Sequence, residues 1–558
     1  MAATRTEVVI VGAGPAGMIV ALELGRRGVS CMLLDAEPAP PRFPKANATT
    51  SRTMEHYRRL GFADKVRALG LPEDYPQDIA YFTRFTRHEL ARLEGRSRGE
   101  AARAREGADS RWPTPEPLHR AQQMLIEPVI AGELARWPSI EVRRGWRASR
   151  LLHDSAGASV EAEPLAGGAA ARIDCDYVVG ADGARSMVRE VLGIRYEGQA
   201  GEQRDFLGGR MCAVYLRAAG LYRIIRAGRS WQYWAVNREQ RGVLCAIDGR
   251  ETFVLHVQLP RGVPASVEFA RAAVQATAGA TFDCEIAGVG EWTAGHALVA
   301  GRFGAGRVFL AGDCAHLFTP TGGQGYNTAV DDASNLGWKL AAVCRGWGGS
   351  ALLASYESER KPIARRNTAF ARAMADSIGR MAIPAALEDD TAQGTEARAQ
   401  LGRELLDHCR REFDIPGIHF GAFYGGSPIV AGDGSPSPRD DWHAYTPGAV
   451  PGARAPHVWL DDGVSIFDRF GRDFSLLRFD RALDASALAA AAERAGVPLA
   501  LLDVDSEEAR DLYARDLVLV RPDHHVAWRG NAPPPDPAAL LAAVTGGARI
   551  DRPAPRGS

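Results

Sequence analysis

A glycine-rich segment near the N-terminus has the residue types and the spacing needed to bind a diphosphate. Glycines recur through residues 12–17, between a short β-branched run and a helix-forming stretch. Such glycines permit a tight turn and bring backbone N–H groups and a helix N-terminus against a pyrophosphate. The aspartate that ends the next apolar run is placed to accept hydrogen bonds from a ribose. We expect an adenine dinucleotide to contact Gly12, Gly14, Ala16, Gly17 and Asp35; the alternative is a tight turn in an unrelated α/β domain.

Two later segments favour FAD over NAD as that dinucleotide. Residues 176–189 predict a strand, an Asp-Gly turn and the start of a helix, and residues 306–316 predict a strand that ends in Gly-Asp. The second strand leads through a glycine loop into a long helix, whose N-terminus offers free N–H groups and a partial positive charge. Those groups suit the anionic N1–C2=O edge of a reduced flavin. The residues expected to contact the flavin or its ribityl chain are Asp182, Asp313, Pro320, Gly323, Gly325 and Asn327.

In order and spacing, the three motifs resemble those of the single-component class A FAD-dependent aromatic hydroxylases. The resemblance is greatest to the phenol hydroxylase and 2,4-dichlorophenol 6-monooxygenase branch, and it covers nearly the whole chain, including segments 51–55 and 451–459. Within it, Gln123 matches a glutamine that contacts FAD in relatives. Lys45 occupies a position where many relatives carry an arginine near the flavin.

The resemblance implies a reaction as well as a cofactor. In that family NADH or NADPH reduces the FAD, O2 adds at the flavin C4a, and the hydroperoxide delivers a hydroxyl group to an electron-rich ring, ortho to an existing phenolic hydroxyl. The flavin supplies the oxygen chemistry while the protein binds, orients and excludes water. A small phenolic substrate, NAD(P)H and O2 are the expected partners. The alternatives are a polycyclic natural-product intermediate as substrate and a non-catalytic FAD-binding protein.

The group that would act on the phenol departs from the family pattern. Relatives carry an aspartate where this chain has Asn47, whose amide is no base at neutral pH. His256 aligns at or near a tyrosine of the relatives, and an imidazole with a pKa of roughly 6.5 can accept a phenolic proton; the alternative is a polar residue on the solvent face of its strand. His296 is the second catalytic candidate, either at the pocket floor or hydrogen-bonded within the sheet. The expected substrate contacts are Asn47, His256, Pro320 and Tyr233, where Tyr233 either stacks on the substrate or belongs to a packed core.

The elements that must position these residues predict an α/β fold. We expect a Rossmann-like FAD-binding domain with an inserted antiparallel-sheet substrate domain and a C-terminal thioredoxin-like domain. Segment 76–112 is expected to be a loop on the active-site side, and no cysteine follows Cys409, so the last domain has no dithiol and a structural or dimerisation role is its default. The expected bounds are 1–75, 113–190 and 291–380 for the FAD-binding domain, 76–112 and 191–290 for the substrate domain, 381–444 for a helical segment and linker, and 445–545 for the thioredoxin-like domain.

Composition limits the other possibilities. The 558 residues contain 67 Lys+Arg and 68 Asp+Glu, so no overall field attracts nucleic acid or an anionic membrane. Hydrophobic residues make up 46% and charged residues 24%, as in ordinary globular proteins. The eight cysteines show no CxxC spacing, so we expect no metal site of that type. The apolar run 8–22 is interrupted by glycines and is shorter than the roughly 20 residues that span a bilayer. We expect a cytoplasmic protein, with a homodimer possible.

Overall fold

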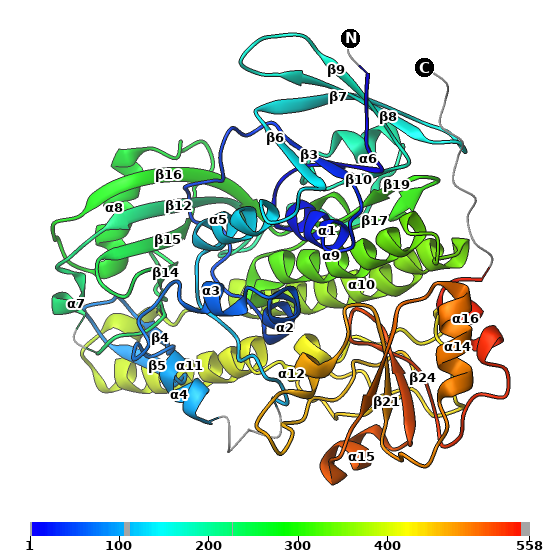
Figure 1. Cartoon of the computed structure of the whole chain (residues 1–558). Helices are drawn as coiled ribbons and strands as arrows, with labels where there is room; N and C mark the ends of the chain where they lie inside the picture. The colour runs from blue at the N-terminus through cyan, green and yellow to red at the C-terminus, as the bar shows by residue number, and fades with distance from the viewer. Residues whose placement is uncertain (1–2, 105–111, 226, 548–558) are drawn as a thin grey trace.

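The N-terminal part of the chain is built around a six-stranded sheet (Figure 1) in a computed structural model that describes residues 3–104, 112–225 and 227–547. Neighbouring strands are parallel apart from the edge pair β18–β19. Every residue of β2 is buried, as the apolar sequence of a parallel strand covered on both faces requires. The spatial order is β18 (Gly304–Ala305), β19 (Val308–Leu310), β10 (Tyr177–Gly180), β2 (Val8–Val11), β3 (Cys31–Asp35) and β6 (Ile140–Arg144).

Helices and two smaller sheets surround this central sheet. Helix α1 (Pro15–Gly25) packs against α9 (Gln324–Cys344) and α5 (Gln123–Leu134), and α9 packs in turn against the long α10 (Ser350–Gly379). One small sheet has the order β1 (Ala3–Arg5), β9 (Ala171–Cys175), β8 (Ala158–Pro164) and β7 (Trp146–His153), at the top of Figure 1. The other contains β11 (Tyr196–Gln199), β17 (Ala297–Ala300) and β20 (His316–Leu317).

A seven-stranded sheet forms the second region, on the left of Figure 1. Its order is β16 (Glu285–Ala294), β12 (Gly209–Arg217), β15 (Thr252–Gln258), β14 (Gly242–Ala246), β13 (Gln232–Ala235), β4 (Ile79–Phe82) and β5 (Glu89–Leu93). All pairs are antiparallel except β13 with β4. The expected antiparallel substrate sheet is present, and it includes one parallel pair because β4 enters from a distant part of the chain.

The expectation of a loop over 76–112 is also wrong. That segment contains β4, β5 and α4 (Arg98–Arg103), which begins with a capping box between Ser97 and Glu100. The four residues of β4 are buried, and their apolar sequence was the available signal. Charged residues of the edge strand β5 and of α4 follow closely in the sequence, and they made the whole segment resemble a polar loop. Residues 105–111 lie outside the described part of the chain.

The two faces of the seven-stranded sheet meet different partners. Residues paired across strands share a face, and the face alternates along each strand. Gly242 lies opposite Val257, and a side chain at Gly242 would meet Thr277 of α8 (Val267–Ala278), so α8 covers that face. Cys245 and His256 belong to the other face, which we call the inner face. The side chain of Asn47, from the N-terminal region, contacts it through Cys245.

The C-terminal region has a four-stranded mixed sheet with helices on both sides. Its order is β22 (Leu499–Asp503), β21 (Phe474–Arg478), β23 (Leu517–Val520) and β24 (Val526–Gly530). Adjacent residues of β21, Leu476 and Leu477, belong to two separate hydrophobic cores. Helices α14 (Ser486–Ala495) and α16 (Pro537–Val544) pack together on the side of Leu476, and α15 (Glu507–Tyr513) contributes to the core of Leu477.

Buried ion pairs join this C-terminal region to the N-terminal helices. Arg521 donates to both carboxylate oxygens of Glu359 on α10, at 2.7 and 2.8 Å, and also to Asp523 at 2.7 Å. The ammonium of Lys339 on α9 lies 2.6 Å from Glu359. All four side chains are 0–2% exposed. We call this group the C-terminal interface cluster.

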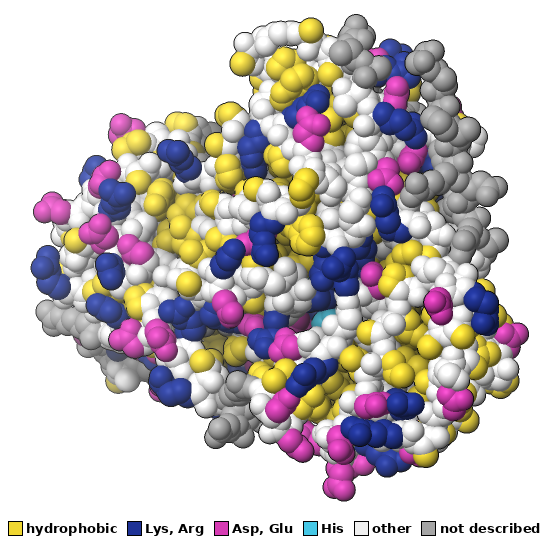
Figure 2. All heavy atoms as spheres, in the orientation of Figure 1, with side chains coloured by type: hydrophobic (Ala, Val, Ile, Leu, Met, Phe, Trp, Pro, Cys, Tyr) yellow, Lys and Arg dark blue, Asp and Glu magenta, His cyan; other side chains and the backbone are white. Residues whose placement is uncertain are grey.

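The cysteines are free, and seven of the eight are buried, with Cys284 partly exposed. Burial raises the pKa of the thiols of Cys31, Cys175, Cys245 and Cys409 to about 12. Within the described residues there is no group of three or more side chains suited to hold a metal ion. Acidic and basic side chains are mixed over the face shown in Figure 2.

Across the three described stretches, no helix is both long enough and apolar enough to cross a membrane.

Candidate functional site: a dinucleotide crevice facing an aromatic chamber

The glycines of the first loop differ in what a side chain at their positions would contact. Gly12 has φ +107°, and a Cβ there would lie 2.2 Å from the carbonyl oxygen of Ala181. A Cβ at Gly17 would lie 1.9 Å from the carbonyl oxygen of Gly12. A Cβ at Gly14 would meet nothing within 4 Å. Gly12 and Gly17 thus allow strand, loop and helix to pack, whereas Gly14 borders open space at the start of α1.

That open space has the properties of a diphosphate site. Gly14 is the N-cap of α1, and no side chain caps the helix. The first N–H groups of the helix therefore remain available, together with its positive dipole end. Ala16 is buried, and its Cβ lies 3.2 Å from where a Cβ of Gly312 would be, which brings the first and third motifs together. The arrangement fits a pyrophosphate, and contact of these residues with one stays a prediction.

Asp35 lies at the end of β3 and is oriented by the same loop. One carboxylate oxygen accepts a hydrogen bond from the backbone N–H of Ala13 at 3.0 Å, and the other accepts one from Glu37 at 2.9 Å. Arg144 approaches at 3.5 Å. A carboxylate oxygen has more than one acceptor site, so the group retains capacity for ribose hydroxyls.

The third motif places a second uncapped helix start beside the first. Gly322 and Gly323 have φ +68° and +65°, and α9 then begins at Gln324 without a side-chain cap. Pro320 is exposed and its carbonyl accepts from the N–H of Gly323 at 3.0 Å. Gly325 lies in the first turn of α9, where backbone N–H groups have no partner within the helix. These donors suit the negatively charged edge of a reduced flavin.

Two polar residues expected at the flavin are engaged by the protein itself. The carboxylate of Asp182 accepts from the hydroxyl of Ser186 at 2.6 Å and from the thiol of Cys314 at 3.2 Å. The side chain of Asn327 accepts from the N–H of Thr50 at 2.8 Å and donates to the carbonyl of Ala48 at 3.0 Å. Both therefore shape the loops. Direct contact with FAD stays a prediction for them.

Asp313, Lys45 and Gln123 are the remaining residues expected to contact the cofactor. The Asp313 side chain is exposed, and no described residue donates a hydrogen bond to it, whereas its carbonyl accepts from Tyr196. Lys45 is exposed on the segment after β3. Gln123 begins α5; its N–H donates to the carbonyl of Ala46 at 2.8 Å and its amide donates to Glu127 at 2.5 Å. All three remain cofactor contacts by prediction.

The substrate candidates divide between the two faces of the seven-stranded sheet. The amide of Asn47 donates to the thiol of Cys245 at 3.0 Å. Cys245 pairs with Val254, and His256 follows two residues later, so Cys245 and His256 share the inner face. Tyr233 pairs with Leu244 and therefore lies on the face of α8. The structure brings Asn47 and His256 to one face and places Tyr233 on the other.

His256 lies against aromatic side chains. Its ring is edge-on to Trp292 at 5.7 Å, and its Nδ1 is buried without a hydrogen-bond partner among the described residues. Desolvation lowers the pKa of His256 to about 4, so the imidazole is neutral at pH 7. A neutral imidazole can donate one hydrogen bond and accept one. The alternative of a solvent-facing residue does not fit this environment.

Tyr233 and His296 are engaged by nearby backbone. The Tyr233 hydroxyl accepts from the N–H of Ser230 at 2.7 Å and donates to the carbonyl of Gly228 at 3.2 Å. Nδ1 of His296 accepts from the N–H of Gly201 at 3.2 Å. These bonds agree with a packed core around Tyr233 and with a local hydrogen-bonding role for His296. A catalytic role of His296 and a substrate contact of Tyr233 stay predictions without support from contacts.

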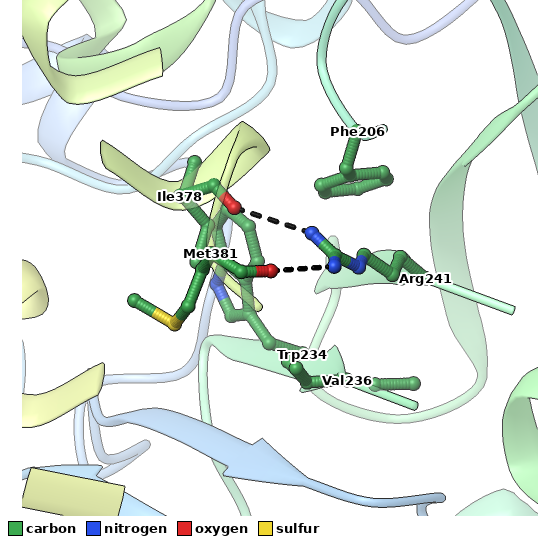
Figure 3. Close-up of a pocket in the computed structure, with 7 residues that line it drawn as sticks. Phe206, Trp234, Val236, Arg241, Ile378 and Met381 are labelled. Atoms are coloured by element: carbon green, nitrogen blue, oxygen red, sulfur yellow. Dashed lines mark hydrogen bonds between the residues drawn. The ribbon is translucent and has the colours of Figure 1, made fainter. Parts of the chain in front are cut away.

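An apolar pocket opens beside Trp234, which pairs with Val243 on the inner face (Figure 3). Phe206 and Ile378 form further walls, and Arg241 closes one side by donating to the carbonyls of Ile378 and Met381 at 3.4 and 2.7 Å. The guanidinium therefore points toward the end of α10 rather than into solvent. The pocket has a volume of about 10 Å³, room for a single water molecule, so it lies beside the inner face without space for a substrate ring.

The sequence analysis overlooked one residue of this region, Arg120. Its guanidinium carbon lies 3.6 Å from the ring centroid of Trp231 and 6.0 Å from that of Phe413. The available signal was its position three residues before Gln123, in a segment already expected to lie near the cofactor. A single arginine among many gives no sequence pattern that separates it from the others.

The two neighbouring helix starts without side-chain caps, at the glycine loops that precede α1 and α9, suit a flavin dinucleotide. The chain belongs to the FAD-dependent aromatic-ring hydroxylases. The family model described as FAD binding domain matches residues 5–371, and the one described as aromatic-ring hydroxylase, C-terminal, matches residues 448–548. The resemblance seen in the sequence is thereby confirmed, and so are FAD as cofactor and monooxygenase as enzyme class.

Individual relatives span almost the full chain. The FAD-dependent monooxygenase apdD of Emericella nidulans is 32% identical over 94% of this chain and 87% of the relative. The 2,4-dichlorophenol 6-monooxygenase of Delftia acidovorans is 29% identical over 94% and 95%. Among solved structures, RebC with bound 7-carboxy-K252c aligns with a TM-score of 0.88 and 34% identity, covering 98% of this chain and 100% of that one.

Proposed function

We propose that the enzyme uses NADH or NADPH and O2 to hydroxylate an electron-rich, phenolic aromatic ring, ortho to its hydroxyl. The observation that carries the proposal is the juxtaposition of the flavin-type loops with the inner face, where Asn47, Cys245 and His256 lie together. A polycyclic substrate is the form we favour over a simple phenol. The likeness to RebC, whose bound ligand is a carboxylated K252c, supports the same choice. A simple phenol is the second candidate, supported by the dichlorophenol monooxygenase relative.

FAD supplies the electron transfer and the oxygen chemistry when it is bound. The N-terminus of α1 holds the pyrophosphate, and Asp35 orients the adenosine ribose. The first turn of α9 stabilises negative charge on the flavin ring with backbone donors that are fixed before the reaction starts. Gly323 keeps that turn close to the segment before α2 (Ser51–Leu60), because a Cβ there would contact Ala48 at 3.4 Å.

On the substrate side, His256 positions the phenol rather than removing its proton outright. A phenol of ordinary pKa, near 10 as in tyrosine, does not transfer its proton to an imidazole of pKa about 4. The neutral ring can still accept a hydrogen bond from the phenol and direct its ring carbon to the flavin. Asn47 lacks the charge of the aspartate found in relatives, so it also contributes by hydrogen bonding. Trp292 limits the movement of the imidazole.

Purified protein tests the proposal directly. We expect it to carry FAD and to oxidise NADH or NADPH faster when a phenolic substrate is present, with one oxygen atom recovered in the product. A panel that runs from monocyclic to four-ring phenols decides between the two substrate sizes. A protein that stays colourless after incubation with FAD contradicts the proposal. So does bound FAD whose reduction no phenol accelerates.

A further inference from the structure

Arg120 points from the N-terminal region toward the inner face. Segment 119–123 runs antiparallel to segment 46–49, since Thr49 and His119 exchange backbone hydrogen bonds of 2.8 and 2.9 Å. The next side chain, Ala121, faces the opposite way, because a Cβ at Gly70 would lie 3.0 Å from it. The guanidinium of Arg120 consequently stacks on Trp231, at the start of β13.

No described residue accepts a hydrogen bond from this guanidinium. Its Nε is buried without a hydrogen-bond partner, and no ion pair joins Arg120 to any described carboxylate. Burial lowers the pKa of Arg120 to about 9, opposed by the nearby thiols of Cys245 and Cys409. Those thiols are neutral at pH 7, so they supply no countercharge. The position where relatives carry an aspartate is Asn47, which donates its own hydrogen bond to Cys245.

Three of the most deeply buried arginines are paired with carboxylates. Arg454 donates to both carboxylate oxygens of Glu55, and Arg521 donates to Glu359 and Asp523. Arg360 contacts Asp331 and Asp332. Arg120 is partly buried, and a guanidinium whose Nε is desolvated without an acceptor gains from a ligand that supplies an anion. Stacking on one indole compensates for only part of the cost of desolvation.

We propose that Arg120 binds a carboxylate carried by the aromatic substrate. Nε and one Nη of a guanidinium form a planar pair of donors that matches the two oxygens of a carboxylate, whereas a phenolate offers a single oxygen. The nearby Gln122 also has its amide oxygen and nitrogen buried without partners among the described residues, so it can donate to the same group. The inference rests on the proposed function and names the substrate class as hydroxylated aromatic acids.

Matched ligands test this assignment without turnover. The probes are two pairs, phenol with salicylate and 1-naphthol with 1-hydroxy-2-naphthoate, titrated into the FAD-loaded enzyme by perturbation of the flavin absorbance. We expect the acid of the better-binding pair to bind at least 10-fold more tightly than its neutral partner. Arg120→Gln is expected to weaken binding of the acid 10-fold or more while it changes binding of the neutral partner less than 2-fold. Arg120→Lys, which keeps the charge and loses the planar pair of donors, is expected to bind the acid with an affinity between those of the wild type and Arg120→Gln.

The control is Arg210→Gln, because Arg210 is partly exposed on β12 and paired with Glu291 at 2.7 Å. It is expected to leave both affinities unchanged. A structural role for Arg120 predicts a lower melting temperature for Arg120→Gln, whereas removal of an unpaired, partly buried charge predicts an equal or higher one. The assignment is overturned if neither acid binds more tightly than its neutral partner, or if the preference persists in Arg120→Gln.

Failure of the assignment and failure of the proposed function have different signatures. Hydroxylation of neutral phenols with no preference for acids leaves the function standing and removes the carboxylate site. An acid preference that depends on Arg120, without hydroxylation of any ligand, leaves the site standing and removes the function.

Discussion

Two contacts of the N-terminal region differ in how their positive charges are compensated. At the C-terminal interface cluster, Arg521 and Lys339 are matched by Glu359 and Asp523, all almost completely buried. At the inner face, Arg120 stacks on an indole, and its Nε has no acceptor among the described residues. The first contact is complete within the folded chain, whereas the second, on our proposal, is completed by the carboxylate of the substrate. The comparison thus sets a structural contact beside a proposed binding contact.

Breaking the C-terminal interface cluster is expected to have the largest effect on stability. Glu359→Gln removes the carboxylate that compensates both Arg521 and Lys339, and truncating one partner of a buried pair costs about 3–5 kcal/mol. Denaturant unfolding, followed by tryptophan fluorescence, measures it. Arg478→Gln, at the more exposed pair with Asp503, is the control and is expected to cost less than about 1 kcal/mol. Equal losses for the two variants would contradict the comparison.

Acidification is expected to weaken the fold through histidines in both regions. Burial lowers the pKa of His56 and His256 to about 4 and that of His119 and His419 to about 3. Below the unfolded pKa of roughly 6.5, the unfolded chain binds protons that the folded one does not, so stability falls as pH falls. At pH 5 each group contributes a loss of about 2 kcal/mol relative to pH 7.

The measurement is the urea midpoint at pH 7 and at pH 5. His119→Gln removes one of the four groups, so its midpoint is expected to move less between the two pH values than that of the wild type. An exposed residue, His153, provides the control substitution, and His153→Gln is expected to leave the pH dependence unchanged. Equal midpoints at both pH values in the wild type would contradict the assignment of these four buried histidines as neutral.

Substitutions of glycines in the cofactor loop are expected to have effects of intermediate size, and they distinguish FAD binding from folding. Gly14→Ala adds a methyl group into open space outside α1, so the protein is expected to fold normally and bind FAD about 10-fold more weakly, or about 1.4 kcal/mol. Gly17→Ala meets the carbonyl of Gly12 at 1.9 Å and is expected to destabilise the domain itself. Flavin titration and circular dichroism of the FAD-free proteins distinguish the two. Unchanged FAD affinity in Gly14→Ala would show that the diphosphate lies elsewhere.

The smallest expected change in rate concerns His256. His256→Ala is expected to leave FAD binding and stability nearly unchanged while it uncouples NAD(P)H oxidation from hydroxylation several-fold. Because the pKa of His256 is about 4, coupling in the wild type should show no transition near pH 6.5. Oxygen consumed per product formed is the measurement. Unchanged coupling and rate in the variant remove His256 from the mechanism.

Residues of the cofactor loops are easier to recognise in a sequence than residues of the inner face, for a physical reason. The dinucleotide loops are continuous segments in which glycine is required by φ or by contact, so Gly12 and Gly17 leave a local signature. The inner face is assembled from residues far apart in the chain, such as Asn47 and Cys245, whose proximity depends on strand order. The alternation of side chains along β13 is visible in the sequence. Only the register with β14 shows that Tyr233 lies on the face covered by α8, away from the expected substrate. Arg120 was missed because the absence of a partner is a property of the folded state.

The buried cysteines bear on how long such an enzyme survives its own chemistry. Flavin enzymes that react with O2 release hydrogen peroxide whenever reduction and hydroxylation are uncoupled, and peroxide attacks thiolates rather than thiols. Thiols such as Cys31 and Cys175, whose pKa is raised to about 12, are almost entirely protonated at neutral pH. Cys245, beside the expected substrate, is protected in the same way. The raised pKa thus keeps these thiols in the protonated form, which reacts slowly with peroxide.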